Sequence, residues 1–329
     1  MIFKRFQSNA VQVFNRSIKL RQRQRAALDP RSSEVEYLRN LVADLTVERL
    51  SIINRNYTNF LDFGCNGGNF LKSLLLSNPK DAEVNDLVLS KLKNVYLLDS
   101  CQELLFKNNF DQASSAAGLS IEKVLVQDEE SSDFLAKHQD YFDGVISNLS
   151  LHWVNDLPSV FKKINDSLKP DGMFMGSIFA LDTLFELRSS FQLSELERKN
   201  GLSPHISPFV QSNDISNILN KTNFRLVTLD VDEIVVSYPR LINLMEDLKL
   251  MGENNCLSSL ESISLSKDIL ISTEAIYKEL YGKKDDKVPG GVALPATFRI
   301  IFFIGWKNSE NQPKPLERGS AKVTLKDAL

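Results

Sequence analysis

Short apolar runs alternate with helical apolar spacings over the first 180 residues of this chain. After the first run, apolar residues return at Phe70, Leu71, Leu74 and Leu75, which is the spacing of an amphipathic helix. The runs typical of buried strands occupy 59–63, 94–99, 124–129, 141–148 and 173–179. Strands that alternate with helices in this way predict an α/β fold, with a mostly parallel sheet and helices on both faces.

Beyond residue 180 the helical spacings dominate. We expect helices over 182–199 and 212–222, the first with Asp182 as its N-cap, and a largely helical segment over 240–282. A long sixth strand is expected over 224–238, with a bulge in its acidic stretch at 230–233. The insert before the last strand is long for an open α/β fold, and it is expected to form a cap over the substrate side.

The charge is unevenly distributed along the chain. The net charge of -3 argues against bulk electrostatic binding to nucleic acid, yet residues 1–28 hold seven Lys and Arg residues and no acid. An acid-free basic start with interspersed Phe and Val is similar to a mitochondrial transit segment. A basic surface helix is the alternative, and both readings hold if only the first dozen residues are removed. The strongest apolar run, 300–306, is far shorter than a bilayer span, so any membrane contact is expected to be peripheral.

A glycine-rich turn, Asp-Phe-Gly-Cys-Asn-Gly-Gly at 62–68, follows the first strand. Glycine permits positive φ there, and the free N–H groups of the next helix offer donors to a ligand. Asp62, two residues before Gly64, would repel a phosphate and favour a positive charge. The turn resembles the first motif of class I S-adenosylmethionine-dependent methyltransferases, whose ligand carries an ammonium and a sulfonium. Asn66 stands at the usual middle glycine, and asparagine tolerates the left-handed conformation. A turn that only packs helix on strand is the alternative.

This resemblance implies a Rossmann-like sheet of seven strands, the last of them (297–306) antiparallel at the sheet edge, and a ligand beyond the strands' carboxyl ends. Asp99 ends the second strand, where an acid accepts hydrogen bonds from ribose, unless it only caps the next helix. Asp128 and Glu129 stand where the adenine amino group is contacted, and Asn148 walls the site. The cofactor residues are therefore predicted to be Asp62, Gly64, Asn66, Gly68, Asp99, Asp128, Glu129 and Asn148. The chain divides into a basic segment (1–28), a cofactor-binding core (29–180), a cap with the sixth strand (181–296), and the last strand with a tail (297–329).

Three residues are candidates for catalysis. His152 follows the fourth strand, where a polar side chain faces the cofactor or substrate, although a packed histidine is the plain alternative. His205 lies in a two-proline loop, and Asp182 belongs to one of several acidic pairs that together suit a cationic substrate, since a guanidinium binds carboxylates in bidentate fashion. No C-x-x-C pair or G-x-S-x-G elbow occurs, so we predict no metal site and no Ser-His-Asp chemistry.

Over residues 13–323 the chain resembles the family of arginine hydroxylases that act as assembly factors of mitochondrial respiratory complex I. The resemblance rests on 13–16, 21–27, 61–68, 150–158, 168–172, 182–188, 203–209, 244–248, 251–253, 304–307 and 318–321. Leu-His-Trp and the Lys-Pro-Asp-Gly turn are shared with methyltransferases such as the malonyl-acyl-carrier methyltransferase of biotin synthesis. The segments at 182–188, 203–209 and 244–248 are more particular to the hydroxylases. This sequence departs from them at Ala180 and Leu181, where the family tends to carry a glycine pair.

The resemblance implies hydroxylation of an arginine on an iron–sulfur subunit of complex I, early in assembly, at the matrix face of the inner membrane. It also implies contact with assembly intermediates and a pocket for S-adenosylmethionine, while the residues specify no oxidant. Two alternatives remain open. A methyltransferase proper, acting on protein or carboxyl groups, needs little beyond alignment of acceptor and sulfonium. A chaperone with this fold would need no reaction at all.

Overall fold

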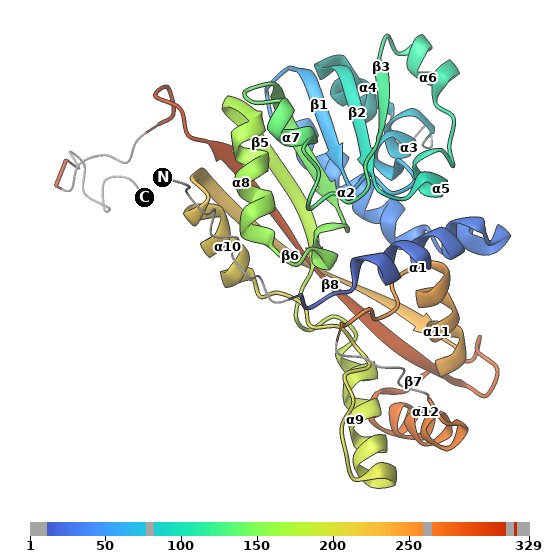
Figure 1. The fold of residues 1–329 in the computed structure, drawn as a ribbon. Helices are drawn as coiled ribbons and strands as arrows, with labels where there is room; N and C mark the ends of the chain where they lie inside the picture. The colour runs from blue at the N-terminus through green and yellow to red at the C-terminus, as the bar shows by residue number, and fades with distance from the viewer. Residues whose placement is uncertain (1–11, 77–81, 259–264, 314–318, 321–329) are drawn as a thin grey trace, which may run out of the picture.

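The computed structural model describes residues 12–76, 82–258, 265–313 and 319–320. Its strands form one sheet in the order β3-β2-β1-β4-β5-β8-β6, with the short β7 paired to β8 (Figure 1). The strands are β1 (Tyr57–Phe63), β2 (Leu92–Asp99), β3 (Ser120–Leu125), β4 (Phe142–Asn148), β5 (Leu168–Phe179), β6 (Phe224–Tyr238), β7 (Lys283–Lys284) and β8 (Val292–Lys307). The first five are mutually parallel, as the alternating pattern predicts. Most of the predicted C-terminal tail and the first eleven residues of the basic segment lie outside the described residues.

The helices flank this sheet and build the cap. They are α1 (Arg16–Leu28), α2 (Tyr37–Ile52), α3 (Asn69–Leu76), α4 (Ala82–Lys91), α5 (Gln102–Leu105), α6 (Asp111–Ala116), α7 (Phe134–Lys137), α8 (Leu157–Ser167), α9 (Phe185–Lys199), α10 (Ser212–Lys221), α11 (Leu241–Leu250) and α12 (Lys267–Tyr281), with short 3-10 turns η1 (Pro30–Ser33) and η3 (Leu151–Trp153). Within the described ranges, none of these helices is both long and apolar enough to cross a bilayer.

The last strand is antiparallel, as expected, but its predicted place at the sheet edge is wrong. β8 pairs with β5 on one side and with β6 on the other, so β6 forms the edge. Burial explains this order. β8 carries a continuous apolar run that is covered on both faces, whereas β6 alternates apolar and charged residues and is largely accessible. A strand that is apolar on both faces is stable inside a sheet, and an alternating strand tolerates the edge.

Two local predictions are also wrong. The irregularity in β6 falls between Arg225 and Thr228, ahead of the acidic stretch where we expected a bulge. Helix α9 begins at Phe185, after Leu184 in the left-handed conformation (φ 55°), so Asp182 is not its N-cap. The reason lies in the preceding turn, which β8 holds in place: the Leu184 backbone N–H donates to the carbonyl of Thr297 over 2.7 Å.

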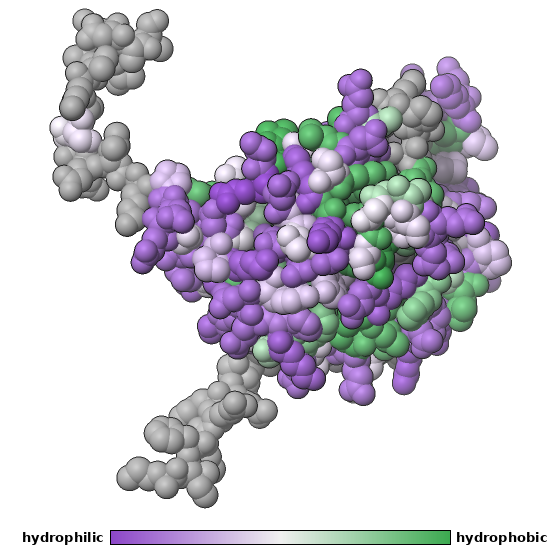
Figure 2. Space-filling model, turned by 90° about the horizontal axis from the view of Figure 1, so that it is seen from above, coloured by the Kyte–Doolittle hydropathy of each residue, from purple (hydrophilic) through white to green (hydrophobic). Residues whose placement is uncertain are grey.

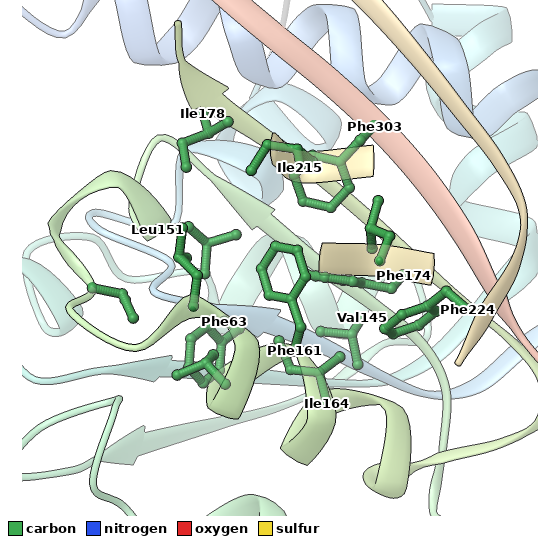
Figure 3. Close-up of a cluster of buried hydrophobic side chains, with 14 of the residues drawn as sticks. Phe63, Val145, Leu151, Phe161, Ile164, Phe174, Ile178, Ile215, Phe224 and Phe303 are labelled. Carbon is green, nitrogen blue, oxygen red and sulfur yellow. The ribbon is translucent and has the colours of Figure 1, made fainter. Parts of the chain in front are cut away.

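Apolar side chains fill both faces of the sheet. One cluster packs α8 and α10 against the sheet, and in it the ring of Phe174 contacts those of Phe161, Phe224 and Phe303 (Figure 3). A second cluster lies under α2, α3 and α4 on the opposite face. Hydrophilic side chains cover most of the face seen in Figure 2, and hydrophobic residues gather in separate areas toward one side of it.

The cap is built on the two longest strands, β6 and β8. β5 pairs with β8 only as far as Phe179, opposite Ile300, while β6 and β8 stay paired on to Tyr238 and Leu294. Beyond β5 these strands form a two-stranded ribbon, and α9, α11 and α12 lie around it (Figure 1). A third apolar cluster joins this cap to α2 of the core. Helix α1 runs between the core and the cap, across the carboxyl ends of the strands.

Candidate functional site

The predicted glycine turn forms a loop between β1 and α3. Gly64, Asn66 and Gly68 have φ values of 71°, 54° and 71°, so the left-handed conformation expected for Asn66 is confirmed. The backbone N–H groups of Gly64 and Cys65 both donate to the carbonyl of Leu98, which ties the loop to the end of β2. The loop therefore presents its backbone at the carboxyl ends of β1 and β2, where ligands of such sheets bind.

Asp99, the last residue of β2, is fully buried beside this loop. Its Oδ1 accepts from the backbone N–H of Cys101 (2.7 Å), and its Oδ2 accepts from that of Asn66 (2.9 Å). A third donor comes from α1: Nη2 of Arg23 lies 2.7 Å from Oδ2, and it also donates to Oδ1 of Asn66 over 3.0 Å. The carboxylate that we predicted to accept hydrogen bonds from ribose thus binds an arginine of the same chain.

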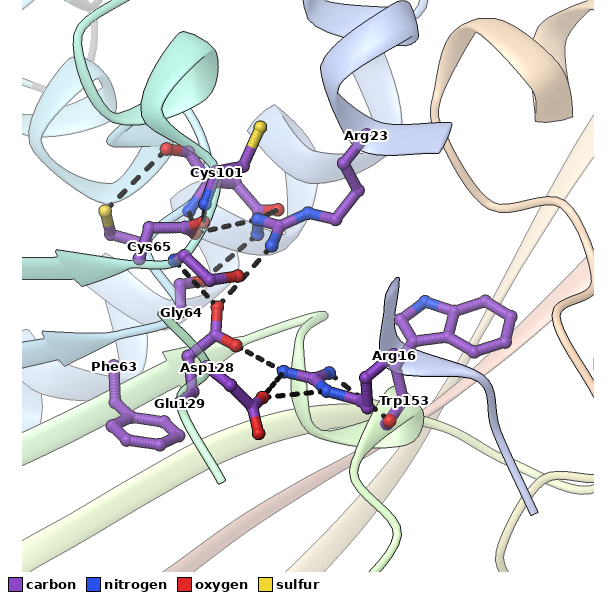
Figure 4. A network of polar contacts seen from close by, with 12 residues as sticks. Arg16, Arg23, Phe63, Gly64, Cys65, Cys101, Asp128, Glu129 and Trp153 are labelled. Atoms are coloured by element: carbon purple, nitrogen blue, oxygen red, sulfur yellow. Dashed lines mark hydrogen bonds and ion pairs between the residues drawn. The ribbon is translucent and has the colours of Figure 1, made fainter. Parts of the chain in front are cut away.

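Asp128 and Glu129, beyond the end of β3, hold a second arginine of α1. Arg16 donates to Oδ1 of Asp128 over 2.7 Å and forms an ion pair with Glu129. Glu129 also lies 3.5 Å from Arg23 and accepts from the backbone N–H of Ser100. Burial alone would raise the pKa of Glu129, but Arg16 and Arg23 lower it to about 2. Figure 4 shows both guanidinium groups pointing from α1 into this acidic cluster.

Asp62 and Asn148 face a small cavity on the other side of the glycine loop, lined also by Arg39 and Phe70. Asp62 is 1% exposed, and its Oδ1 has no hydrogen-bond partner among the described residues; neither has Nδ2 of Asn148. Burial, and then the negative charge of Asp99, raise the pKa of Asp62 to about 8. The unpartnered Oδ1 of Asp62 could accept from a cationic ligand group, and the unpartnered Nδ2 of Asn148 could donate to a ligand oxygen.

The titration of Asp62 gives a first prediction. Because its folded pKa of about 8 lies above its ordinary value of 3.8, the folded protein binds more protons than the unfolded chain between these values. The unfolding free energy of the ligand-free protein should therefore fall as pH rises through this window, by up to about 1.4 kcal/mol per pH unit. Asp62→Asn should remove that slope in urea unfolding between pH 5 and 8. Parallel curves for the two proteins would contradict the assignment.

His152, predicted as catalytic, lies buried in η3 at the junction of core and cap. Its Nε2 is 3.1 Å from Oε2 of Glu253, while its Nδ1 has no partner among the described residues. Burial lowers the pKa of His152 despite the nearby carboxylate, so the imidazole is neutral at neutral pH. Glu253 also accepts from Trp153 Nε1 (2.8 Å) and from Arg39 (2.7 Å). Glu253 therefore organises one polar cluster between the cofactor side and the cap.

His205 lines a cavity of about 530 Å³ beneath the cap. Its Nε2 is 2.8 Å from Oε1 of Glu195, and its ring packs on Phe191 with centroids 4.6 Å apart. Glu253 lies on the wall of the same cavity, which is otherwise largely apolar. Asp182 is not among the residues of this wall. It is more than half exposed and pairs with Arg299 over 2.7 Å, so the structure does not bring the three candidate catalytic residues together.

The acidic pairs do not gather into one cradle for a cation. Asp232 pairs with Arg49 and Glu233 with Arg299, both on accessible parts of β6. The buried Glu186 bonds to Thr297. Within the described ranges, no three His, Cys, Asp or Glu side chains come together as a metal ion would require. Of the acids near the carboxyl ends of the sheet, Asp99, Asp128 and Glu129 already bond arginines of α1, whereas Asp62 does not.

Sequence reasoning gave no role to Arg16, Arg23, Arg39 or Glu253. A signal was available for the first two, because residues seven apart lie on the same face of a helix. Arg39 and Glu253 carry no such signal, since one lies on α2 and the other in the loop after α11 and only the fold brings them together.

The comparisons with known proteins agree with this geometry. A protein-family model described as a methyltransferase domain matches residues 35–229, more than half of the chain. A putative methyltransferase from Bacillus halodurans has a similar structure, with a TM-score of 0.50 at 14% identity, over 81% of this chain and 99% of that one. The sheet order and the loop therefore define a class I methyltransferase fold.

Curated relatives narrow the assignment from the methyltransferase fold to one protein family. The human protein named "Arginine-hydroxylase NDUFAF5, mitochondrial" is 39% identical over 313 residues, covering 95% of this chain and 82% of its own length. The zebrafish protein (Danio rerio) of the same name is 37% identical over 315 residues, covering 96% of this chain and 89% of its own length. The chain belongs to this family of methyltransferase-fold arginine hydroxylases, as the sequence motifs had indicated.

Proposed function

We propose that this protein hydroxylates an arginine side chain of a protein substrate, an iron–sulfur subunit of mitochondrial complex I, during early assembly. The observation that carries the proposal is the family membership, at 37–39% identity over nearly the whole chain to relatives named for arginine hydroxylation. The names of those relatives also support a mitochondrial location. We place the protein at the matrix face of the inner membrane, in peripheral contact with it and with assembly intermediates.

The pocket at the glycine loop suits S-adenosylmethionine. The orphaned Oδ1 of Asp62 and Nδ2 of Asn148 fit the charged end of an amino acid, and Arg39 on the same cavity wall suits its carboxylate. Asp99 would accept hydrogen bonds from the ribose, and Asp128 with Glu129 would face the adenine. When bound, this cofactor would supply a sulfonium and a positive charge beside the substrate.

The cavity beneath the cap is the proposed substrate side. The neutral imidazole of His152 is bonded to Glu253 on the wall of this cavity, and its Nδ1 could accept a proton or a hydrogen bond. His205 lies on the wall of the cavity and is held there by Glu195 and Phe191. In this arrangement His152 orients the reacting side chain, and the apolar wall excludes water. We keep Asp182 only as a contact at the rim, because its carboxylate is exposed beside Arg299.

Intact-peptide mass spectrometry of the iron–sulfur subunit tests the proposal. We expect a gain of one oxygen on one arginine in cells that contain the wild-type protein, and no gain in cells that lack it. Asp99→Asn should abolish the gain, because the amide offers the ribose only one acceptor. Asp166→Asn, at an exposed position paired with Lys162, is the matched control and should leave the modification intact.

Two other outcomes would overturn the hydroxylase assignment. A gain of one methyl group, with release of S-adenosylhomocysteine, would identify a methyltransferase. Unmodified arginine in wild-type cells, together with normal assembly in the Asp99→Asn cells, would identify a chaperone. Purified protein and peptide, incubated in air and under argon, would show whether the added oxygen needs O₂.

A further inference from the structure

In the nucleoside half of the proposed cofactor pocket, the carboxylates are bonded by arginines of the protein itself. Arg23 occupies the carboxylate of Asp99 and the side chain of Asn66, while Arg16 occupies Asp128 and Glu129 (Figure 4). Although burial disfavours a charge, Asp99 and Glu129 raise the pKa of the Arg23 guanidinium, so it remains charged. Arg23 is 8% exposed and its ion pairs are correspondingly well shielded from water.

Arg23 and a ribose would use the same atoms. Oδ1 of Asp99 already accepts from Cys101, and Oδ2 accepts from both Asn66 and Arg23. A carboxylate oxygen with two donors in place has little capacity left for a hydroxyl. The other half of the pocket is different, because Oδ1 of Asp62 and Nδ2 of Asn148 have no hydrogen-bond partner in the part of the chain that the structure describes.

Helix α1 is held by polar contacts more than by apolar packing. Its buried residues are Lys19, Arg23 and Ala26. Nζ of Lys19 donates to the carbonyls of Gly252 and Asn254 (3.0 and 2.6 Å) and lies 3.4 Å from the centroid of the Trp153 ring. A helix attached through ion pairs and hydrogen bonds can exchange those partners for a ligand without losing a large buried apolar surface.

We propose that α1 is an internal competitor of the cofactor: Arg23 and Arg16 bind the carboxylates that receive the nucleoside, and a nucleoside-bearing ligand must displace them. This inference rests on the proposed function, since it assumes that the pocket takes S-adenosylmethionine. Because Arg16 and Arg23 lie on one face of α1, a ligand that displaces the helix displaces both arginines from the carboxylates. Lys19 connects α1 to the loop after α11, and this loop lines the cap cavity. Cofactor entry is thereby coupled to the substrate side.

Calorimetric titration with S-adenosylhomocysteine tests the competition. If α1 excludes the ligand, the apparent affinity of the wild-type protein is reduced by the fraction of molecules in which the site is free. Arg23→Met should therefore bind at least tenfold more tightly than the wild type. Arg21→Met removes the same charge from an exposed position of the same helix and should bind within twofold of the wild type. Arg23→Lys, which keeps a charge but loses the planar fork, should be intermediate.

Limited proteolysis tests the same inference without a substitution. Trypsin should cleave α1 of the wild-type protein at the exposed Arg21 and Arg25 faster when S-adenosylhomocysteine is present, because the ligand releases the helix. Protection of these sites, or equal or weaker binding by Arg23→Met, would overturn the inference and make Arg23 part of the ligand-bound pocket. Absence of binding to both proteins would overturn it too. A failure of the hydroxylase proposal would be detected by a different measurement, the mass of the substrate arginine.

Discussion

Asp99→Ala is expected to lower the free energy of unfolding by about 3–5 kcal/mol, the range found when one partner of a buried ion pair is removed. Asp99 is fully buried, and its loss leaves Arg23 without its nearest carboxylate. An arginine cannot relieve the situation by releasing its proton. The backbone N–H groups of Asn66 and Cys101 lose their acceptor as well. Urea unfolding monitored by circular dichroism measures the effect.

A double-mutant cycle separates the ion pair from the other contacts of Asp99. Asp99→Ala combined with Arg23→Met should recover at least half of the lost stability, because no unpaired charge then remains. Asp166→Ala, in an exposed i,i+4 pair, should change the unfolding free energy by less than about 0.5 kcal/mol. Additive effects of Asp99→Ala and Arg23→Met would show that the two side chains do not interact.

Glu253→Ala is expected to have an effect of similar size, about 3–5 kcal/mol, at the junction of core and cap. Glu253 accepts from Arg39 of α2 and from His152 and Trp153, which both belong to η3. The substitution leaves the half-buried Arg39 guanidinium without its carboxylate partner, although it still donates to the carbonyl of Met251, and it leaves the two buried ring N–H groups unpaired. Urea unfolding again measures the loss, and Glu253→Gln should lose less because it keeps one acceptor oxygen.

The pH dependence of this effect follows from the pKa of Glu253. Burial would raise it, but His152, Arg39 and Lys19 lower it far below its ordinary value of 4.5. A carboxyl group with a depressed folded pKa stabilises the protein above its ordinary pKa and loses that contribution as pH falls. The stability difference between wild type and Glu253→Gln should thus be constant from pH 6 to 8 and shrink below pH 4.5. A difference that grows in acid would contradict this assignment.

The sequence predicted the parallel half of the sheet well. The strands β1, β2, β4 and β5 are apolar on both faces, so their runs stand out, and the turn at 62–68 can only be built with residues that accept positive φ. The position of β8 was harder to predict. Its length and apolar character are visible in the sequence, but whether it lies inside or at the edge depends on β6, whose partners are far away in the chain.

The site was predicted in part. Acids at strand ends are visible locally, and the structure places Asp62, Asp99, Asp128, Glu129 and Asn148 around the predicted crevice. The partners of those acids could not be predicted from the sequence, because Arg23 and Asp99 are 76 residues apart and only the fold brings them together. Asp182 lies apart from the other two candidate catalytic residues for a local reason, since the turn before α9 is bonded to β8 and Asp182 pairs with Arg299.

The cap of this protein cannot be removed as a module. Its helices are connected to the same two strands that complete the core sheet, since β8 pairs with β5, β6 pairs with β8, and both strands continue into the ribbon. A truncation that deletes the cap would also strip β5 of its neighbour and leave an apolar strand edge open to self-association. Core and cap should accordingly denature as one cooperative unit, and rearrangement of the cap during turnover must proceed by twisting the ribbon, because the strands offer no flexible linker at which it could swing.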